Sequence, residues 1–131
     1  SFFQLTVRHN QAELGGGVSI DSVVNTKTWI CYDVTLTNNH AFSSGGGYHL
    51  GSRALLHVDD IFLLRCFYAR NNTAHCFGHD KASDPASLVV ATSPTAMLGQ
   101  SLHVDVTPLD FFKNKMACAT RSDSYRLVAG V

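Results

Sequence analysis

The residues with the clearest potential for metal chemistry lie between positions 66 and 79. Cys66, His75, Cys76 and His79 follow the spacing C-x8-H-C-x2-H, and thiolate and imidazole groups bind Zn²⁺ tetrahedrally. His75 and Cys76 are adjacent, however, so their side chains on a strand would point to opposite faces. We therefore expect no metal at this cluster. The other histidines lie near no nucleophile motif, and we expect them on solvent-exposed faces: His9, His40, His49, His57 and His103.

Cleavage of polysaccharides is a second chemistry to consider, and it requires carboxylates that meet on one face. Asp59 and Asp60 are the only adjacent acidic residues, and Asp33 could lie beside them in a folded repeat. Adjacent residues of a strand point in opposite directions, so at most one of the pair can join such a site. Aspartates that form turns are the simpler interpretation. We therefore expect no catalytic residues and no cofactor, and a polysaccharide-degrading enzyme is kept as an alternative.

Two glycine triplets could suggest a phosphate-binding loop. They are Gly15, Gly16 and Gly17, and Gly45, Gly46 and Gly47. Neither triplet is followed by Lys-Ser or Lys-Thr, or by a segment that favours a helix. We therefore interpret both as turns in which glycine allows positive φ angles.

Composition excludes several classes of protein. Ten basic and ten acidic residues cancel, and the pI is about 7.0, so no charge pattern indicates binding to nucleic acid. No apolar segment approaches the roughly 18 residues needed to span a membrane. A chain of 131 residues is long enough for one domain. It opens Ser-Phe-Phe-Gln without a signal peptide, so we expect a processed product or a piece of a longer chain.

The chain contains an internal repeat of about thirty residues. An Asn-x-Ala step occurs three times, at Asn10 and Ala12, at Asn39 and Ala41, and at Asn72 and Ala74. The asparagines are 29 and 33 residues apart, and the two glycine triplets are offset by 30. A weaker third copy of the glycine motif reads FGHD at residues 77–80. Recurrence of both signatures in the same order indicates a repeat architecture.

Each repeat holds about three short segments with strand character, and no window shows a sustained helical period. Three strands per repeat of this length are typical of one coil of a parallel β-helix. Its asparagines could form a ladder, bonding from coil to coil at a spacing of about 4.8 Å, and they tolerate left-handed backbone at a bend. The small alanines would fit a tight corner. A β-sandwich or another all-β fold is the alternative.

The glycine motif reads GGGV and GGGY, and the asparagines end the sequences VRHN, LTNN and ARNN. In these motifs the chain resembles the polymorphic outer membrane protein repeats. There, GGA[ILVY] and FxxN motifs recur along the parallel β-helix passengers of bacterial autotransporters, and related repeats occur in large surface proteins of algae and other protists. The phenylalanine of FxxN is absent here. The resemblance covers roughly residues 1–80 and implies a right-handed parallel β-helix of about three coils.

The remainder of the chain differs in composition from the repeats. Residues 81–101 contain two of the three prolines and predict a connection. Residues 102–131 alternate like strands and resemble the V-x-V-x-x-x-D-x-x-x-N opening of immunoglobulin-like modules that follow β-helices in long surface proteins. A whole sandwich needs about 100 residues, so this segment is too short to form one. We expect a short β segment that caps the last coil, pairs with another chain or begins such a module.

The four cysteines are candidates for disulfides. They are Cys31, Cys66, Cys76 and Cys118. Alignment on Asn39 and Asn72 places Cys31 opposite Leu64, on the same face as Cys66, so these two could bridge neighbouring coils. Cys66 with Cys76 is an equal contender, and four buried thiols are a further interpretation. Asn71, Asn72 and Thr73 form a glycosylation sequon with Asn71 as the acceptor.

A solenoid of few coils exposes strand edges at its ends, which must be capped or joined to another copy. We therefore expect an extracellular or cell-surface structural protein or adhesin, with coils that stack end to end within a longer chain or between subunits of a fibre. Glycans are further expected partners, whereas nucleic acid and a membrane span are not. A carbohydrate-binding module is an alternative, in which exposed aromatic rings would stack on sugars: Trp29, Tyr32, Tyr48 or Tyr68.

Overall fold

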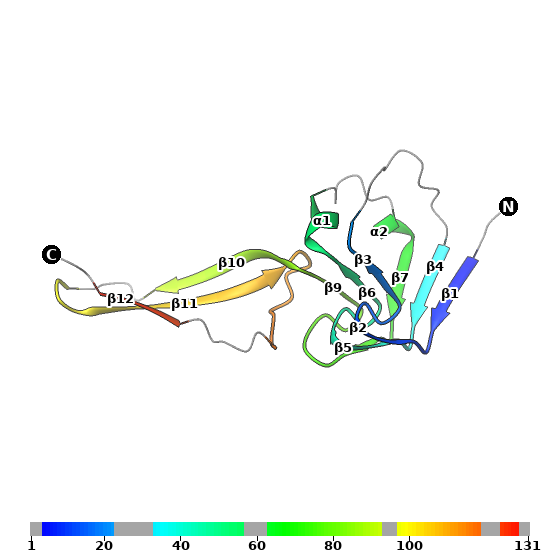
Figure 1. The fold of residues 1–131 in the computed structure, drawn as a ribbon, viewed down its shortest axis with the longest axis horizontal. Coiled ribbons are helices and arrows are strands. Elements are labelled where there is room, and N and C mark those ends of the chain that lie inside the picture. Colours follow the sequence, from blue (N-terminus) through cyan, green and yellow to red (C-terminus); the bar gives the residue numbers. More distant parts are fainter. Residues whose placement is uncertain (1–3, 23–32, 57–62, 93–96, 119–123, 129–131) are drawn as a thin grey trace.

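The chain forms an all-β fold, as the sequence predicts, with two helices of four residues each in the described part (Figure 1). The computed structural model describes residues 4–22, 33–56, 63–92, 97–118 and 124–128. The helices are α1 (Ser52–Leu55) and α2 (Leu63–Cys66). Over these ranges, neither helix is long and apolar enough to cross a membrane.

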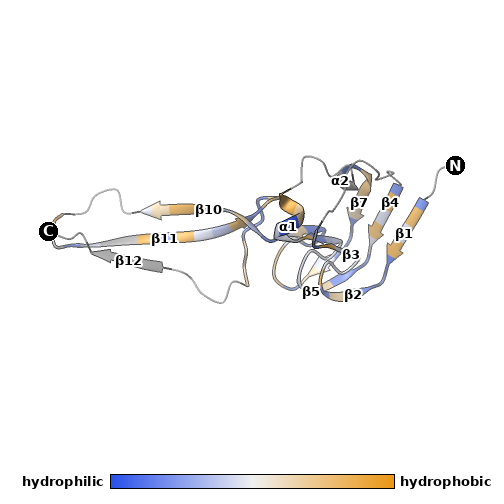
Figure 2. Cartoon of the chain, turned by 45° about the horizontal axis from the view of Figure 1, so that its top comes forward, coloured by the Kyte–Doolittle hydropathy of each residue, from blue (hydrophilic) through white to orange (hydrophobic). Residues whose placement is uncertain are grey.

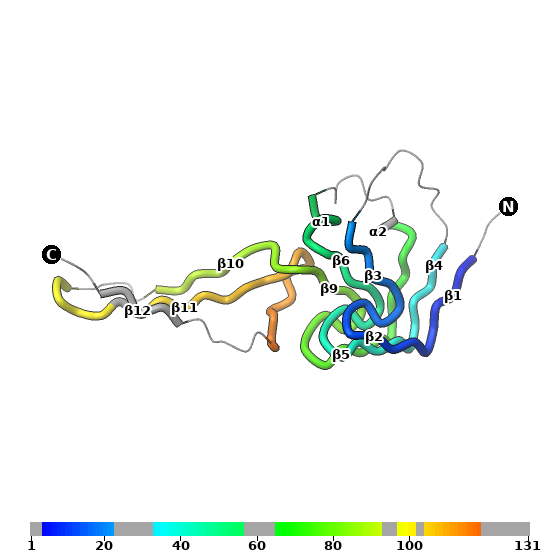
Figure 3. Tube along the Cα trace, in the orientation of Figure 1, coloured from blue at the N-terminus to red at the C-terminus, as the bar shows by residue number. Residues whose placement is uncertain are grey.

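The three repeats form three parallel sheets of three strands each, which we call the repeat stack. Each repeat adds one strand to each sheet, so successive repeats of the chain lie side by side (Figure 3). The first sheet has the order β1-β4-β7, the second β2-β5-β8 and the third β3-β6-β9. The strands of the first repeat are β1 (Gln4–Arg8), β2 (Gln11–Leu14) and β3 (Val18–Ile20). Those of the second are β4 (Asp33–Thr37), β5 (His40–Ser44) and β6 (Tyr48–Leu50), and those of the third are β7 (Phe67–Arg70), β8 (Thr73–Ala74) and β9 (Lys81–Ser83).

Two kinds of residue turn the chain between the sheets. The residue before each repeated asparagine has a left-handed backbone, with φ of 58° at His9, 55° at Asn38 and 55° at Asn71. The expectation that the repeated asparagines themselves hold this conformation was therefore wrong by one position. Their side chains bond across the stack, and the exposed preceding residue makes the bend. At the next corner, the first glycine of each triplet has positive φ, 61° at Gly15 and 71° at Gly45.

The hydrophobic core lies between the sheets of the second repeat. Val34 and Leu36 of β4 pack with Tyr48 and Leu50 of β6, and all four are at most 8 % exposed. On β4 the buried residues alternate with more exposed ones, as expected for a strand with one buried face, whereas all three residues of β6 are buried. Partly buried side chains from the first and third repeats, from α1 and from the C-terminal segment complete the core: Val7, Val18, Ile20, Leu55, Phe67, Ala69 and Phe112.

The C-terminal part forms an antiparallel sheet with the order β10-β11-β12, which extends away from the repeat stack (Figure 1). Its strands are β10 (Pro85–Thr92), β11 (Ser101–Asp110) and β12 (Ser124–Val128). Residues 81–101, which we expected to be a connection, therefore contain β9 and β10. Pro85 is tolerated because it is the first residue of β10, and the β-branched residues that follow favour a strand.

Candidate functional site

The three repeated asparagines lie in one column across the repeat stack. Oδ1 of Asn39 accepts hydrogen bonds from the backbone N–H of Asn10 at 3.0 Å and from its Nδ2 at 3.3 Å. Oδ1 of Asn72 accepts the same two bonds from Asn39, at 2.9 and 3.1 Å. Each amide thus satisfies polar groups of its neighbour. Because Asn39 is only 1 % exposed and Asn72 only 5 %, these bonds offset the cost of burying polar groups.

Asn39 and Asn72 also bond back to the repeat before them. Nδ2 of Asn39 donates to the carbonyl of Val7 at 3.0 Å, and Nδ2 of Asn72 donates to the carbonyl of Leu36 at 2.9 Å. Both acceptors lie three residues before the preceding asparagine of the column. Nδ2 of Asn39 therefore donates to both the preceding and the following repeat, while its Oδ1 accepts from Asn10 in the preceding repeat.

Alanines and glycines fit closely around this column. Ala12, Ala41 and Ala74 pair in register, and the last two are buried. A Cβ on Gly17 would lie 2.9 Å from Nδ2 of Asn39, and one on Gly47 would lie 2.9 Å from Nδ2 of Asn72. The third glycine of each triplet therefore leaves the space that the next repeat's asparagine fills. The other glycines expected at turns, Gly16 and Gly46, would each place a Cβ 2.3 to 2.6 Å from a backbone oxygen of the following repeat.

Asp80 ends the column, and the sequence analysis did not identify it. Tyr48 pairs with Lys81, so Asp80 occupies the place in the third repeat that Gly47 has in the second. Oδ1 of Asp80 accepts from the backbone N–H of Asn72 at 3.0 Å and from its Nδ2 at 2.9 Å. This carboxylate thus takes the part of the next asparagine's oxygen. The signal was present in the alignment of GGG with GHD, which we interpreted only as a weaker glycine motif.

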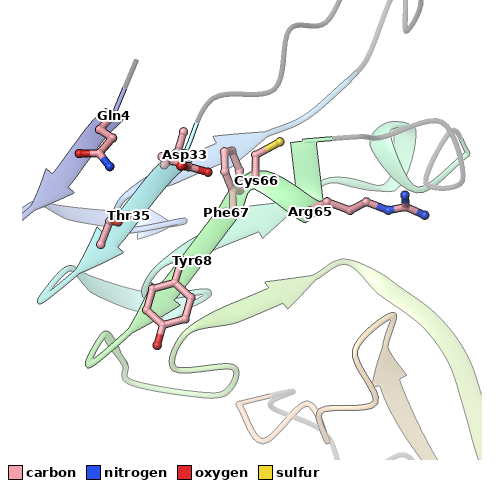
Figure 4. Close-up of a pocket in the computed structure, with 8 residues that line it drawn as sticks. Gln4, Asp33, Thr35, Arg65, Cys66, Phe67 and Tyr68 are labelled. Atoms are coloured by element: carbon pink, nitrogen blue, oxygen red, sulfur yellow. The ribbon is translucent and has the colours of Figure 1, made fainter. Parts of the chain in front are cut away.

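A groove of about 300 Å³ lies on the β1-β4-β7 sheet (Figure 4). Its polar lining includes Gln4 and Asp33, which pair in register, and Thr35, which pairs with Tyr68. The ring of Tyr68 is 61 % exposed, and the guanidinium of Arg70 lies 5.6 Å from its centre. The rest of the lining consists of Val34, Arg65, Cys66 and Phe67.

The other aromatic candidates differ from Tyr68 in their surroundings. Tyr48 is only 4 % exposed and contacts the rings of Phe67 and Phe112, so it cannot stack on a sugar, contrary to the expectation. Its burial raises the pKa of the phenol to about 12. Trp29 and Tyr32 lie outside the described residues.

The acidic candidates are only partly placed. Asp33 is exposed and lines the groove, whereas Asp59 and Asp60 lie outside the described residues. Arg65 extends away from the other labelled side chains of the groove (Figure 4). The enzyme alternative therefore stays a prediction.

One of the two predicted disulfide pairs does not form. Cys76 forms a disulfide with Cys118, with a Cα–Cα distance of 5.1 Å, so the Cys66–Cys76 pair was wrong. Both predicted pairs lie within the repeats, whereas in the structure the segment after β11 returns to the third repeat and brings Cys118 to Cys76. Cys66 is also disulfide-bonded. Cys31, its other predicted partner, lies outside the described residues.

The cluster first considered for zinc has other uses in the structure. Cys76 is committed to its disulfide, and Nδ1 of His79 accepts a hydrogen bond from the backbone N–H of Ala74 at 3.0 Å. In the described ranges, no group of three or more histidine, cysteine or acidic residues could hold a metal ion.

His49 is buried, although we expected it to face solvent. It lies on β6 and is 2 % exposed, because the chain after β9 passes beside it and places Asp84 Oδ1 3.6 Å from its Nε2. Burial lowers the pKa of His49, against the opposing effect of Asp84, Asp21 and Asp110. Its Nδ1 finds no hydrogen-bond partner in the part of the chain that the structure describes.

The predicted glycosylation site faces outward. Asn71 is exposed at the bend, while Asn72 points into the column. This is the arrangement that a glycan on Asn71 requires.

Comparison with protein families, with curated proteins and with solved structures gives no match to this chain. The resemblance to polymorphic outer membrane protein repeats therefore stays a prediction from the motifs.

Proposed function

We propose that the chain is a structural section of an extracellular or cell-surface protein. In this proposal residues 4–83 form about three coils of a right-handed parallel β-helix, and the segment from β10 to β12 follows its last coil. The observation that carries the proposal is the column of asparagines and alanines, in which equivalent residues of successive repeats bond to one another. Such regular contacts between neighbours are the source of stability in solenoid proteins, which present extended surfaces for binding.

The disulfide and the sequon support the proposed location. Disulfides persist in oxidising environments outside the cytosol, and the Cys76–Cys118 bond joins two segments 42 residues apart. Asn71 is exposed within an Asn-x-Thr sequence, so it is accessible to a glycan in a secretory pathway.

The location can be tested on the cells that make the protein. Free thiols are blocked before lysis, and the protein is analysed by mass spectrometry without reduction. We expect a linked pair of peptides containing Cys76 and Cys118, and antibody labelling of intact, unpermeabilised cells. Blocked thiols at both cysteines, or labelling only after permeabilisation, would contradict the proposal.

Binding of carbohydrate is a second candidate function, and the groove beside Tyr68 favours it. An exposed aromatic ring next to amide, carboxylate and hydroxyl groups can stack on a sugar while the polar groups bond its hydroxyls. Affinity electrophoresis in gels that contain polysaccharides tests this role. We expect Tyr68→Ala to abolish any retardation that the unmodified protein shows. Phe42→Ala is the matched control, because Phe42 is 54 % exposed but lies on the β2-β5-β8 sheet.

A further inference from the structure

The two ends of the repeat stack differ in their bonding. At the end formed by the third repeat, side chains of the same chain bond to the outer backbone groups. Oδ1 of Asp80 accepts hydrogen bonds from the backbone N–H and from Nδ2 of Asn72, and Nδ1 of His79 accepts one from the backbone N–H of Ala74. On β9, the N–H of Ser83 donates to Oδ2 of Asp110, and the carbonyl of Lys81 accepts from Nδ2 of Asn114. Phe112 packs against the core from the same segment, which the Cys76–Cys118 disulfide joins to the third repeat.

At the opposite end, formed by the first repeat, the equivalent outward-facing polar groups have no such partners among the described residues. Oδ1 of Asn10 accepts no hydrogen bond from the described residues, although its counterparts in Asn39 and Asn72 each accept two. The backbone gives the same picture. His40 N–H donates to the carbonyl of Asn10 at 2.9 Å, and Thr73 N–H donates to that of Asn39 at 2.9 Å. Gln11 is the register equivalent of His40 and of Thr73, so its backbone N–H points away from the second repeat, toward the outer edge of β2.

The apolar side chains agree with this asymmetry. Leu5 on β1 is 54 % exposed and Leu14 on β2 is 38 % exposed, whereas Val34, the register partner of Leu5 one repeat on, is 8 % exposed. Among the described residues, the strands β1, β2 and β3 each pair on one side only. Unpaired parallel edges of this kind are templates for a further strand.

We propose that the outer edge of β1, β2 and β3, together with the amide of Asn10, docks one further coil of the same repeat. The bonds within the chain specify this partner. Its asparagine would donate to Oδ1 of Asn10, and its carbonyl three residues earlier would accept from Nδ2 of Asn10, as Val7 accepts from Asn39. Its third glycine would leave space for the Asn10 amide, as Gly17 does for Asn39.

The partner is not a second copy of this chain stacked head to tail. The third repeat carries Asp80 where the partner needs glycine, and the Asp80 carboxylate already occupies the position of the next asparagine's oxygen. Asp80 therefore closes one end of the stack, and stacking proceeds only at the Asn10 end. This inference rests on the proposed structural role and adds its direction and the kind of coil that it accepts.

Duplication of the first repeat provides the test. A copy of residues 4–32, with Cys31→Ser in the copy to avoid an unpaired thiol, is placed directly before Gln4. Because Gln4 is the register partner of Asp33, the copy leads into Gln4 as the first repeat leads into Asp33. We expect hydrogen exchange of the Gln11 and Asp21 backbone amides to slow at least tenfold. Asp21 is included because it is equivalent to Gly51, whose N–H donates to the carbonyl of Ile20 at 2.8 Å.

The matched control carries Gly17→Asp in the added copy only, which reproduces the arrangement at Asp80. We expect exchange in this variant to be as fast as in the unmodified chain. Unchanged exchange in the first duplication, or equal slowing in both, would overturn the proposal.

Sedimentation of the unmodified protein gives a second measurement that does not depend on the duplicated chain folding. We expect any self-association to be insensitive to Leu5→Lys. A dimer that Leu5→Lys dissociates would assign this edge to a second copy and overturn the inference. These results are distinct from those on location, because a protein found inside cells could still show the slowed exchange, and a surface protein could fail to show it.

Discussion

At the scale of single residues, the column of asparagines is the feature on which the stack depends most. Asn39 in its centre bonds to both neighbours and to the carbonyl of Val7, while Asn10 at its end makes fewer bonds. A buried group left without its partner costs more than the net gain of the bond itself. The asparagines of the column should therefore contribute unequally to the free energy of unfolding.

Asn39→Ala should lower the free energy of unfolding by about 2 to 4 kcal/mol, because it leaves the Val7 carbonyl and the Asn72 oxygen with fewer donors. Urea unfolding followed by circular dichroism measures the change. Asn10→Ala is the control, and we expect it to cost less than half as much, since Asn10 is exposed and, among the described residues, its side chain bonds only to Asn39. Equal losses at both positions would show that the column is not the source of the stability.

His49 should make the protein less stable in mild acid. Its pKa is lowered in the folded state from the ordinary value of 6.5, so the unfolded chain binds the proton more readily. Well above pH 6.5 the ring is neutral in both states and has no effect on stability. As the pH falls below 6.5, stability is lost, by at most about 1.4 kcal/mol per pH unit for one group.

Urea unfolding at pH 7.5 and at pH 5.5 tests this dependence. We expect His49→Gln to reduce the difference between the two values, and His9→Gln, at an exposed position, to leave it unchanged. A stability that rises as the pH falls would contradict the effect of burial and indicate that Asp84, Asp21 and Asp110 dominate.

At the scale of elements, the repeats were predictable because equivalent residues recur. The Asn-x-Ala step gave the offsets of 29 and 33 residues that reappear as the register of the strands. Strand β10 was missed because residues 81–101, which include it, contain two prolines and several serines and resemble a loop in isolation. The Cys76–Cys118 pair and the burial of His49 depend on where the chain returns after β11 and β9, and local patterns hold no information on such contacts.

The Cys76–Cys118 disulfide should hold the segment after β11 against the third repeat. For a loop of 42 residues, the loss of chain entropy in the unfolded state corresponds to about 4 kcal/mol. We expect the double variant Cys76→Ser and Cys118→Ser to lose about 2 to 4 kcal/mol in urea unfolding, and exchange of the Ser83 amide to accelerate. An unchanged unfolding midpoint would show that the bonds of Asp110 and Asn114 suffice without the disulfide.

At the scale of the whole molecule, the described chain consists of a stack with one open end and an extended sheet. The apolar core of the stack lies between its sheets, whereas β10 exposes three consecutive apolar residues, Leu88, Val89 and Val90, by 50 to 63 % (Figure 2). In the sheet order β10-β11-β12, strand β10 has no second partner strand within the part of the chain that the structure describes. It also contains no charged residue between Pro85 and Thr92. Natural edge strands usually carry charges that prevent pairing between molecules.

The isolated chain should therefore self-associate through β10 at high concentration. We expect Val89→Lys to reduce this association in sedimentation experiments, because a lysine on an edge strand opposes pairing. Leu5→Lys, on β1 of the repeat stack, is the control and should have no such effect. Association that persists in Val89→Lys would place the contact elsewhere.

The exchange of glycine for aspartate at one position has a consequence for how such proteins change in length over evolution. The first and second repeats each carry both an amide and the space for the next repeat's amide, so duplicating such a unit of about thirty residues in a gene would extend the protein without new kinds of contact. A single codon change at the position of Asp80 would then fix where the extension stops. The number of coils in a lineage could thus vary by recombination while one base substitution sets the limit.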